Sequence, residues 1–248
     1  MEVNKIYNED CLDGLKKLPD ESVDLVITDP PYKVTSRGSA GNSGGMLQKD
    51  INRKGQVFKD NDIDIKDWIS EIYRILKDGS HCYIMTNHIN LKNYLNIVEQ
   101  EGFHFIKNLI WNKGNKIMGQ YYMSQYEYIM FLRKGRGQGI NNCGTSDILN
   151  IENKKIKQNE ENIHDTEKPV ELAKVLIENS SKKGDIVVDP FVGVGWVALA
   201  SKILNRDFIC WEINEEYYKW CYRRLGRIDS EYYNQLSEED RPKQQQLI

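Results

Sequence analysis

Short apolar runs that alternate with stretches of helical periodicity constrain this chain most strongly. Residues 23–28 (VDLVIT), 81–86 (HCYIMT) and 185–189 (DIVVD) are compact apolar runs of the kind that form buried strands. Between the first two runs, apolar residues recur at the spacing of one helix face: Ile65, Trp68, Ile69, Ile72 and Leu76. Strands that alternate with helices predict a mostly parallel sheet that is covered by helices on both faces.

The other expected elements follow the same alternation. Further strands are expected at about 3–7, 103–111, 126–134 and 206–212, and further helices at about 11–18, 89–101 and 196–204. Gly79 is expected to end the helix that begins near residue 65, and Pro169 to lie in the first turn of another helix. Residues 134–163 are polar and pattern-poor, so we expect a linker or part of a small lobe there.

Composition limits the class of protein. A chain of 248 residues can bury one large core, and no apolar run approaches the roughly 18 to 20 residues that span a bilayer. The first residues, MEVNKIYNEDC, lack the layout of a signal peptide. The five cysteines are odd in number and form no CxxC pair, which favours a reducing compartment, the cytoplasm, and argues against disulfides and a thiolate zinc site. They are Cys11, Cys82, Cys143, Cys210 and Cys221.

The charge distribution is uneven. The net charge is −3, yet residues 33–59 carry six Lys and Arg against Asp50 alone, and residues 104–139 carry six against Glu127 alone. Each segment therefore sums to +5, and the rest of the chain to −3 − 10 = −13. Two basic segments on an acidic body are compatible with a surface that faces phosphates. Charge alone does not distinguish this surface from two solvated loops.

The carboxyl-terminal third has the pattern of a nucleoside-binding unit. Asp189 ends a predicted strand, Gly193 and Gly195 allow a tight turn before a helix, and Glu212 ends the next strand. Open α/β sheets bind ligands at the carboxyl ends of their strands, and a carboxylate there can accept both hydroxyls of a ribose. The turn lacks the third glycine of the dinucleotide fingerprint.

Asp29, Pro30, Pro31 and Tyr32 follow the buried strand at residues 23–28. Two prolines have fixed φ angles and lack backbone donors, so the strand cannot continue through them. A carboxylate and the Pro30 carbonyl, held rigidly, can accept the two N–H groups of an exocyclic amine, and the Tyr32 ring can stack on a base. The competing interpretation is a β-turn with an ordinary solvated aspartate.

With these residues in view, the chain resembles the S-adenosylmethionine-dependent DNA amino-methyltransferases, which act on adenine N6 or cytosine N4. Residues 29–32 (DPPY) resemble the catalytic tetrapeptide of this family, residues 189–195 (DPFVGVG) its methionine-side motif, and residues 211–217 (WEINEEY) its ribose-binding strand. Residues 164–172 (HDTEKPVEL) resemble its H-P-T-x-K-P-x-x-L cofactor motif. The tetrapeptide precedes the cofactor motifs, which is the beta-type order.

The resemblance implies a doubly wound, seven-stranded, Rossmann-like methyltransferase sheet. It implies one catalytic domain over residues 1–228, with DNA-facing loops or a small target-recognition region within 33–62 and 113–163, and a polar tail over 229–248. The implied reaction is methyl transfer from S-adenosylmethionine to adenine N6 of a base flipped out of double-stranded DNA. A homodimer is common in the beta-type group. No metal is required and no membrane contact is expected.

The resemblance also implies roles for individual residues. The catalytic set is Asp29, Pro30, Pro31 and Tyr32. The cofactor set comprises Asp10, Cys11, Asp29, His164, Thr166, Lys168, Asp189, Pro190, Phe191, Gly193, Gly195, Glu212 and Ile213. Lys168 suits the methionine carboxylate of the cofactor, because a cation pairs with it; His164 could equally be an ordinary polar loop residue. The predicted DNA-contacting residues are Lys33, Arg37, Lys49, Arg53, Lys54, Lys113 and Lys116.

The chain departs from the family pattern at a few positions, and these leave alternatives open. Val194 and Trp196 replace the usual hydroxyl residues of the glycine turn, and Asp165 replaces a proline. Cytosine N4 is the nearest alternative target, because Asp29 favours adenine only as a tendency. A DNA-binding protein that has lost catalysis is a further alternative, motivated by Trp196. Methyltransferases that act on RNA or on protein glutamine tend to place the cofactor half first, which argues against them.

Overall fold

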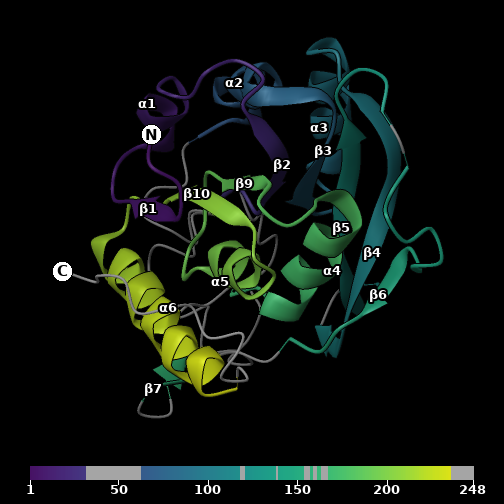
Figure 1. The fold of residues 1–248 in the computed structure, drawn as a ribbon. Helices are drawn as coiled ribbons and strands as arrows, with labels where there is room; N and C mark the ends of the chain where they lie inside the picture. Colours follow the sequence, from purple (N-terminus) through teal and green to yellow (C-terminus); the bar gives the residue numbers. More distant parts are fainter. Residues whose placement is uncertain are drawn as a thin grey trace.

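The computed structural model describes residues 1–31, 63–117, 121–137, 139–153, 157–158, 161–162 and 167–235. These residues form one main sheet of eight strands with helices on both faces (Figure 1). Its strand order is β1 (Lys5–Tyr7), β10 (Asp207–Trp211), β9 (Ile186–Asp189), β2 (Val23–Thr28), β3 (Leu76–Thr86), β5 (Ser124–Arg133), β4 (His104–Ile117) and β6 (Ile148–Asn150). The pairs from β1 to β3 and the β4–β6 pair are parallel, and β5 is antiparallel to both of its neighbours. The predicted α/β class with a mostly parallel sheet is confirmed.

The helices divide between the two faces of the sheet. One face packs against α1 (Cys11–Leu15), α2 (Ile69–Ile75), α3 (Leu91–Gln100) and the short 3₁₀ turn η2 (Ile65–Asp67). The other face packs against α4 (Val170–Ser180), α5 (Trp196–Ile203) and α6 (Glu215–Gln235). Successive strand side chains point to opposite faces, so Val26 joins the first cluster and Leu25 and Ile27 the second. Both faces of the central strands are therefore buried, which explains why apolar residues follow one another in them without alternation.

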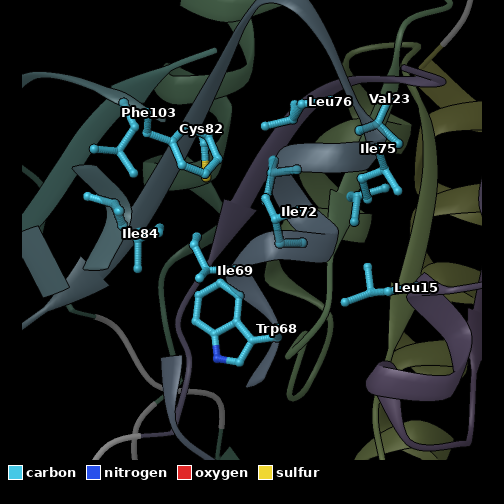
Figure 2. Close-up of a cluster of buried hydrophobic side chains, with 14 of the residues drawn as sticks. Leu15, Val23, Trp68, Ile69, Ile72, Ile75, Leu76, Cys82, Ile84 and Phe103 are labelled. Atoms are coloured by element: carbon cyan, nitrogen blue, oxygen red, sulfur yellow. The ribbon is translucent and has the colours of Figure 1, made fainter. Parts of the chain in front are cut away.

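Trp68 and α2 fill the centre of the first cluster (Figure 2). The predicted helix from residue 65 is divided here into η2 and α2, and α2 ends at Ile75. Leu76 is already extended and pairs with Val23 of β2, so β3 begins there. Gly79 lies inside β3 with φ 81°, and the expectation that it ends the helix is wrong.

The polar segment 134–163 contributes a strand that its sequence did not reveal. Ile148–Asn150 forms β6, which pairs in parallel with β4 at the edge of the sheet. Trp111 of β4 donates its indole N–H to the Ile151 carbonyl (2.8 Å), and Leu149 is buried beneath. The main sheet therefore has eight strands where seven were expected. A separate hairpin joins β7 (Lys157–Gln158) and β8 (Glu161–Asn162).

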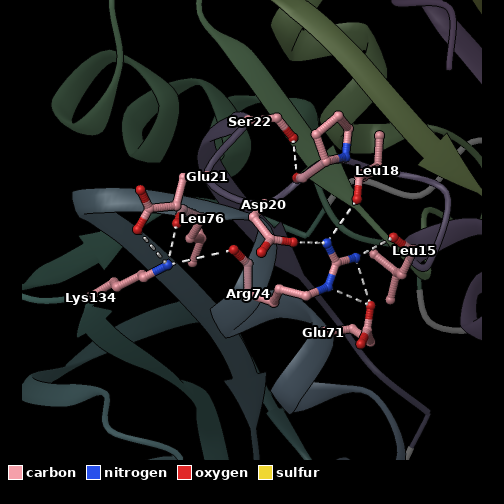
Figure 3. Close-up of polar contacts among 10 residues, drawn as sticks. Leu15, Leu18, Asp20, Glu21, Ser22, Glu71, Arg74, Leu76 and Lys134 are labelled. Carbon is pink, nitrogen blue, oxygen red and sulfur yellow. Dashed lines mark hydrogen bonds and ion pairs between the residues drawn. The ribbon is translucent and has the colours of Figure 1, made fainter.

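Cations tie the amino end of the sheet together (Figure 3). Arg74 at the end of α2 pairs with Glu71 (2.7 Å) and with Asp20 (2.5 Å), and donates to the Leu18 carbonyl (2.8 Å). Lys134, just after β5, is buried and donates to the Leu76 carbonyl (2.7 Å). These cations hold the chain that enters β2 and β3, and they lie away from the carboxyl ends of those strands.

The order of strands changes direction between β2 and β9. After β2 the chain continues to β3 on one side, and after β9 it continues to β10 on the other. In open α/β sheets, ligands bind outside the carboxyl ends of the strands at such a switch point. No helix in the described part of the chain has the length and apolar composition needed to cross a membrane.

Candidate active site

The switch point brings together the aspartates that follow two separate strands. Asp29 comes directly after β2, and Asp189 is the last residue of β9. Thr28 donates its hydroxyl to Oδ1 of Asp189 at 2.9 Å, so the ends of the two strands are joined. The structure therefore places the predicted catalytic motif beside the predicted cofactor motif. Pro30 is buried and Pro31 half-buried.

Asp189 is held as a buried acceptor. Its Oδ1 accepts hydrogen bonds from Thr28 and from the Phe191 backbone N–H (3.0 Å). Its Oδ2 is buried and has no hydrogen-bond partner among the residues that the structure describes. Burial raises the pKa of Asp189 to about 8, against the two hydrogen bonds that lower it. An unsatisfied buried oxygen at the end of a strand is suited to a polar group of a ligand.

The raised pKa of Asp189 predicts a pH-dependent stability. The folded protein keeps this proton up to about pH 8, whereas the unfolded chain loses it near 3.8, so the folded state binds more protons in between. The free energy of unfolding should then fall by about 1.4 kcal/mol per pH unit through this group. Asp189→Asn keeps an oxygen acceptor for Thr28 and removes the titration. Urea unfolding across this range should show a flatter pH slope for the variant, and equal slopes would contradict the prediction.

The glycine turn lies between β9 and α5. Gly193 and Gly195 have φ angles of 57° and 95°, in the left-handed region that favours glycine. A Cβ at Gly195 would also lie only 3.3 Å from Cys221 Sγ of α6. Val194 and Trp196 are 4% and 3% exposed, and Trp196 packs in the cluster with α4. The two unusual residues of the motif therefore serve the core.

Further predicted cofactor residues within the described ranges lie around the same end of the sheet. Glu212 follows β10, and its Oε1 accepts from the Asn214 backbone N–H (2.7 Å). The Asn8 amide donates to the carbonyls of Glu212 (2.8 Å) and Ile213 (3.1 Å), which joins the amino-terminal segment to this strand end. Phe191 meets Trp68 edge-on, with ring centroids 5.5 Å apart, and Pro190 is buried.

Asp10 and Cys11 begin α1. Oδ1 of Asp10 accepts from the Leu12 N–H (2.8 Å) and caps the helix, while the Asp10 residue is exposed. Cys11 is 6% exposed, and burial raises its pKa to about 12. The thiol is therefore not a nucleophile at neutral pH, which agrees with chemistry that needs no covalent intermediate.

Four charged side chains, beginning with Asp29, form a row of ion pairs at the site. Oδ2 of Asp29 is paired with Lys168, whose Nζ also lies 3.5 Å from Oε2 of Glu127. Oε1 of Glu127 is paired with Lys113 of β4. Lys168 is 5% exposed, and the Asp29 and Glu127 side chains are each 16% exposed. Oδ1 of Asp29 is buried and has no hydrogen-bond partner in the described ranges.

Asp29 and Glu127, the two carboxylates among these four side chains, have pKa values shifted in opposite directions. Burial raises the pKa of Asp29; Lys168 opposes the rise and Glu127 adds to it. Burial also acts to raise the pKa of Glu127, but the attraction of Lys168 and Lys113 outweighs it, so this pKa is lowered. Sequence reasoning did not select Glu127. Its one signal was an acid among the aromatic residues of β5, and Lys113 was assigned to DNA instead.

Arg224 links the two segments that carry predicted cofactor residues. This residue of α6 pairs with Glu167 (3.1 Å) and donates to the Val194 carbonyl of the glycine turn (2.7 Å). The Arg224 and Glu167 side chains are only 9% and 3% exposed. Burial lowers the pKa of Arg224, against the attraction of Glu167. The pair therefore fixes the residue before Lys168 to the turn after Asp189.

Several of the other predicted site residues fall where the structure is not described. Eight lie outside the described residues: Tyr32, His164, Thr166, Lys33, Arg37, Lys49, Arg53 and Lys54. Within the basic segment 104–139, Lys107 pairs with Asp147 (3.0 Å) and Lys134 is buried, whereas Lys116 is exposed. Much of this segment's charge is therefore already paired. The described residues contain no group of three or more potential metal ligands.

Comparisons with known proteins agree with this geometry. A family model described as DNA methylase (N6_N4_Mtase) matches residues 23–223. Type II methyltransferase M.HinfI of Haemophilus influenzae is 28% identical over 248 aligned residues, which cover 91% of this chain and 69% of that protein. The M1.HpyAVI–SAM complex has a TM-score of 0.65 at 22% identity, covering 89% of this chain and 99% of that one. The cytosine-N4-specific PvuII DNA methyltransferase has a TM-score of 0.70 at 17% identity, covering 95% and 88%.

These matches bear on two predictions. The structural likeness confirms the methyltransferase type of α/β sheet. The family match spans the tetrapeptide, the glycine turn and both remaining motifs, so the resemblance stated from the sequence is confirmed. Asp10 and Cys11 lie before the matched range.

Proposed function

We propose that this chain, which belongs to the DNA methylase family, transfers a methyl group from S-adenosylmethionine to the N6 amine of a flipped-out adenine in double-stranded DNA. The observation that carries the proposal is the Asp29 carboxylate at the switch point. Its Oδ1 is a buried acceptor without a hydrogen-bond partner among the described residues, and the strand end of Asp189 is adjacent. An amine N–H would satisfy this oxygen.

The chemistry follows from what Asp29 can do. S-adenosylmethionine supplies a methyl group on a positively charged sulfur. The amine lone pair is delocalised into the base, and hydrogen bonds from its N–H groups to Oδ1 of Asp29 and to the Pro30 carbonyl favour the tetrahedral geometry that attack requires. As the N–C bond forms and the S–C bond breaks, the amine must lose a proton, and Asp29 is placed to accept it. The base must leave the helical stack to reach this buried position.

The donor's ends are assigned to different strand ends. We assign the nucleoside to Glu212 and Ile213 after β10, with Asp10 and Cys11 beside them, and the methionine portion to the turn around Gly193 and Gly195. Lys168 would pair with the methionine carboxylate. Relatives of this fold that were solved with S-adenosylmethionine support the choice of donor.

Adenine is preferred to cytosine as the target. Aspartate at the first position of the tetrapeptide accompanies adenine more often in the family. Cytosine N4 is the second candidate, favoured by the likeness in fold to a cytosine-N4-specific enzyme. Both reactions would use the same acceptors, since each target is an exocyclic amine on a flipped base. We further propose residues 1–228 as the catalytic domain and a homodimer, which sedimentation analysis would test.

We assign a face for DNA to exposed aromatic residues near the site. Tyr121, Tyr122 and Met123 precede β5 and are 88%, 96% and 58% exposed. Tyr126 is also exposed, at 44%. The residue after Tyr126 is Glu127, one of the four paired charged side chains that include Asp29. Tyrosines that no core holds can stack on bases around an extruded nucleotide.

Removing two of these rings should weaken DNA use without loss of stability. Tyr121→Ala/Tyr122→Ala is expected to raise KM for duplex DNA by about tenfold or more, since stacking contributes roughly 1–3 kcal/mol per base. A duplex with a mismatch at the target, which is easier to open, should recover part of the loss. Ile106→Ala, an exposed residue near the start of β4, is the control. An unchanged KM for the double variant would contradict the assignment.

Transfer of labelled methyl groups tests the proposal. Purified protein with labelled S-adenosylmethionine should label unmethylated duplex DNA and leave RNA unlabelled. A thermal-shift titration with S-adenosylmethionine separates the inactive DNA-binding alternative, because binding to the folded state raises the melting temperature. No stabilisation by S-adenosylmethionine, together with no labelling of any DNA, would favour that alternative. Labelling of RNA alone would overturn the choice of substrate.

A further inference from the structure

Glu127 is a carboxylate at the site, and its two cationic partners come from two other parts of the polypeptide. It lies in β5, opposite Trp111 of β4, and its two oxygens face different cations. Oε1 is paired with Lys113 from β4, and Oε2 lies 3.5 Å from Lys168, which directly precedes Pro169 and α4. At 16% exposure, the side chain is nearly enclosed. A buried acid with this set of partners requires a role, because burying charge without one is costly.

Lys168 is shared between Glu127 and Asp29. Two carboxylates and two ammonium groups alternate in space, in the order Asp29, Lys168, Glu127 and Lys113, so their formal charges cancel. An ammonium that served Asp29 alone would draw charge from that carboxylate and weaken it as an acceptor. Glu127 attracts the same ammonium from the other side. The acceptor strength of Asp29 therefore depends on how Lys168 divides its attraction.

We propose that Glu127 is a positioning residue for methyl transfer, which draws Lys168 partly away from Asp29 and so keeps the Asp29 carboxylate able to accept the amine of the target base. The inference rests on the proposed function, since it assumes that Asp29 receives that amine. Lys113 anchors Glu127 in this arrangement. A merely structural Glu127 would hold β4, β5 and the start of α4 together and leave the titration of Asp29 unchanged.

The titration of Asp29 reports on this division of charge. Besides burial, the charged groups that act on it are Lys168, Glu127 and Lys113, and Asp29 in turn acts on Asp189 of β9 and Tyr94 of α3. Glu127 raises the pKa of Asp29, and Lys168 and Lys113 lower it. Methyl transfer requires ionised Asp29, so its rate falls as the pH drops through this pKa. That decline is the acid limb of the pH–rate profile.

Two variants should move the acid limb in opposite directions. Glu127→Gln, of the same shape but uncharged, should shift it to lower pH and slow single-turnover transfer at neutral pH by about tenfold. Lys113→Met removes a cation that lowers the pKa of Asp29, so it should shift the limb to higher pH. Glu127→Asp keeps the charge and should retain a limb close to that of the wild type. Glu99→Gln, an exposed acid on α3, is the matched control.

The measurement is the single-turnover rate against pH with saturating DNA and S-adenosylmethionine, on variants whose thermal unfolding has been recorded. Opposite shifts support the inference. A Glu127→Gln variant with the rate and acid limb of the wild type overturns it, as does a slower variant whose acid limb is unmoved. A Glu127→Gln variant that does not fold leaves Lys113→Met as the test, and an unmoved limb there is equally contradictory. A wild-type protein without methyl transfer would instead overturn the proposed function itself.

Discussion

Replacing Asp29 with asparagine is expected to slow single-turnover methyl transfer by about 10³-fold, a loss of roughly 4 kcal/mol in transition-state stabilisation. The amide is isosteric but uncharged, and one of its two terminal atoms becomes a donor where the amine needs an acceptor. Lys168 keeps Glu127 as a partner, so the ammonium is not left alone. The affinity for S-adenosylmethionine should change by less than about tenfold, because the proposed function assigns both ends of the donor to other residues.

A second aspartate of the same region provides a matched control. Asp24 lies near the start of β2, pairs with Lys77 (2.5 Å) and accepts from the Ile186 N–H (2.9 Å). Asp24→Asn therefore disturbs the same strand at the end away from the site, and we expect near-normal methyl transfer. If the Asp29→Asn variant retained more than about a tenth of the wild-type rate, the central role of this carboxylate would be refuted.

Replacing Arg224 with methionine should destabilise the protein by about 3–5 kcal/mol. The change leaves the Glu167 carboxylate buried without the guanidinium that neutralises it, and it removes the hydrogen bond to the Val194 carbonyl. The affinity for S-adenosylmethionine should also fall, because the glycine turn and the residue before Lys168 lose their common support. Urea unfolding and a cofactor titration measure the two effects.

The neighbouring arginine and a double variant make this prediction specific. Arg223 is exposed, with its guanidinium 4.8 Å from the Trp220 ring, and Arg223→Met should cost less than about 1 kcal/mol. Combining Arg224→Met with Glu167→Leu should recover much of the stability, since an apolar pair can replace a buried ion pair. A double variant that is less stable than Arg224→Met alone would show that the pair does not act as described.

The strands that carry the site were predictable because they are buried on both faces. β2, β9 and β10 appear in the sequence as short, mostly apolar runs, and a motif residue ends each run or follows it directly: Asp29, Asp189 or Glu212. β6 was not predictable, because a three-residue edge strand with one buried side chain, Leu149, has no readable period. The early end of α2 depends on pairing between Leu76 and Val23, which no local pattern displays.

The site was predictable where a motif named its residues and obscure where contacts cross the fold. Asp29, Lys168 and Asp189 were each selected from the sequence. Glu127 was not, because its partners lie 14 and 41 positions away along the chain, at Lys113 and Lys168. Arg224 and Glu167 are likewise 57 residues apart. A count of charges along a segment also does not reveal pairing or burial: the fold pairs Lys113 with Glu127 and buries Lys134.

The most direct test of methylation at adenine N6 identifies the methylated nucleoside. Unmethylated genomic DNA would be incubated with the protein and S-adenosylmethionine, digested to nucleosides and analysed by mass spectrometry, with Asp29→Asn in parallel. We expect N6-methyladenine with the wild type and almost none with the variant. N4-methylcytosine would contradict the choice of base, and no methylated nucleoside from a protein that binds the donor would contradict the proposed reaction.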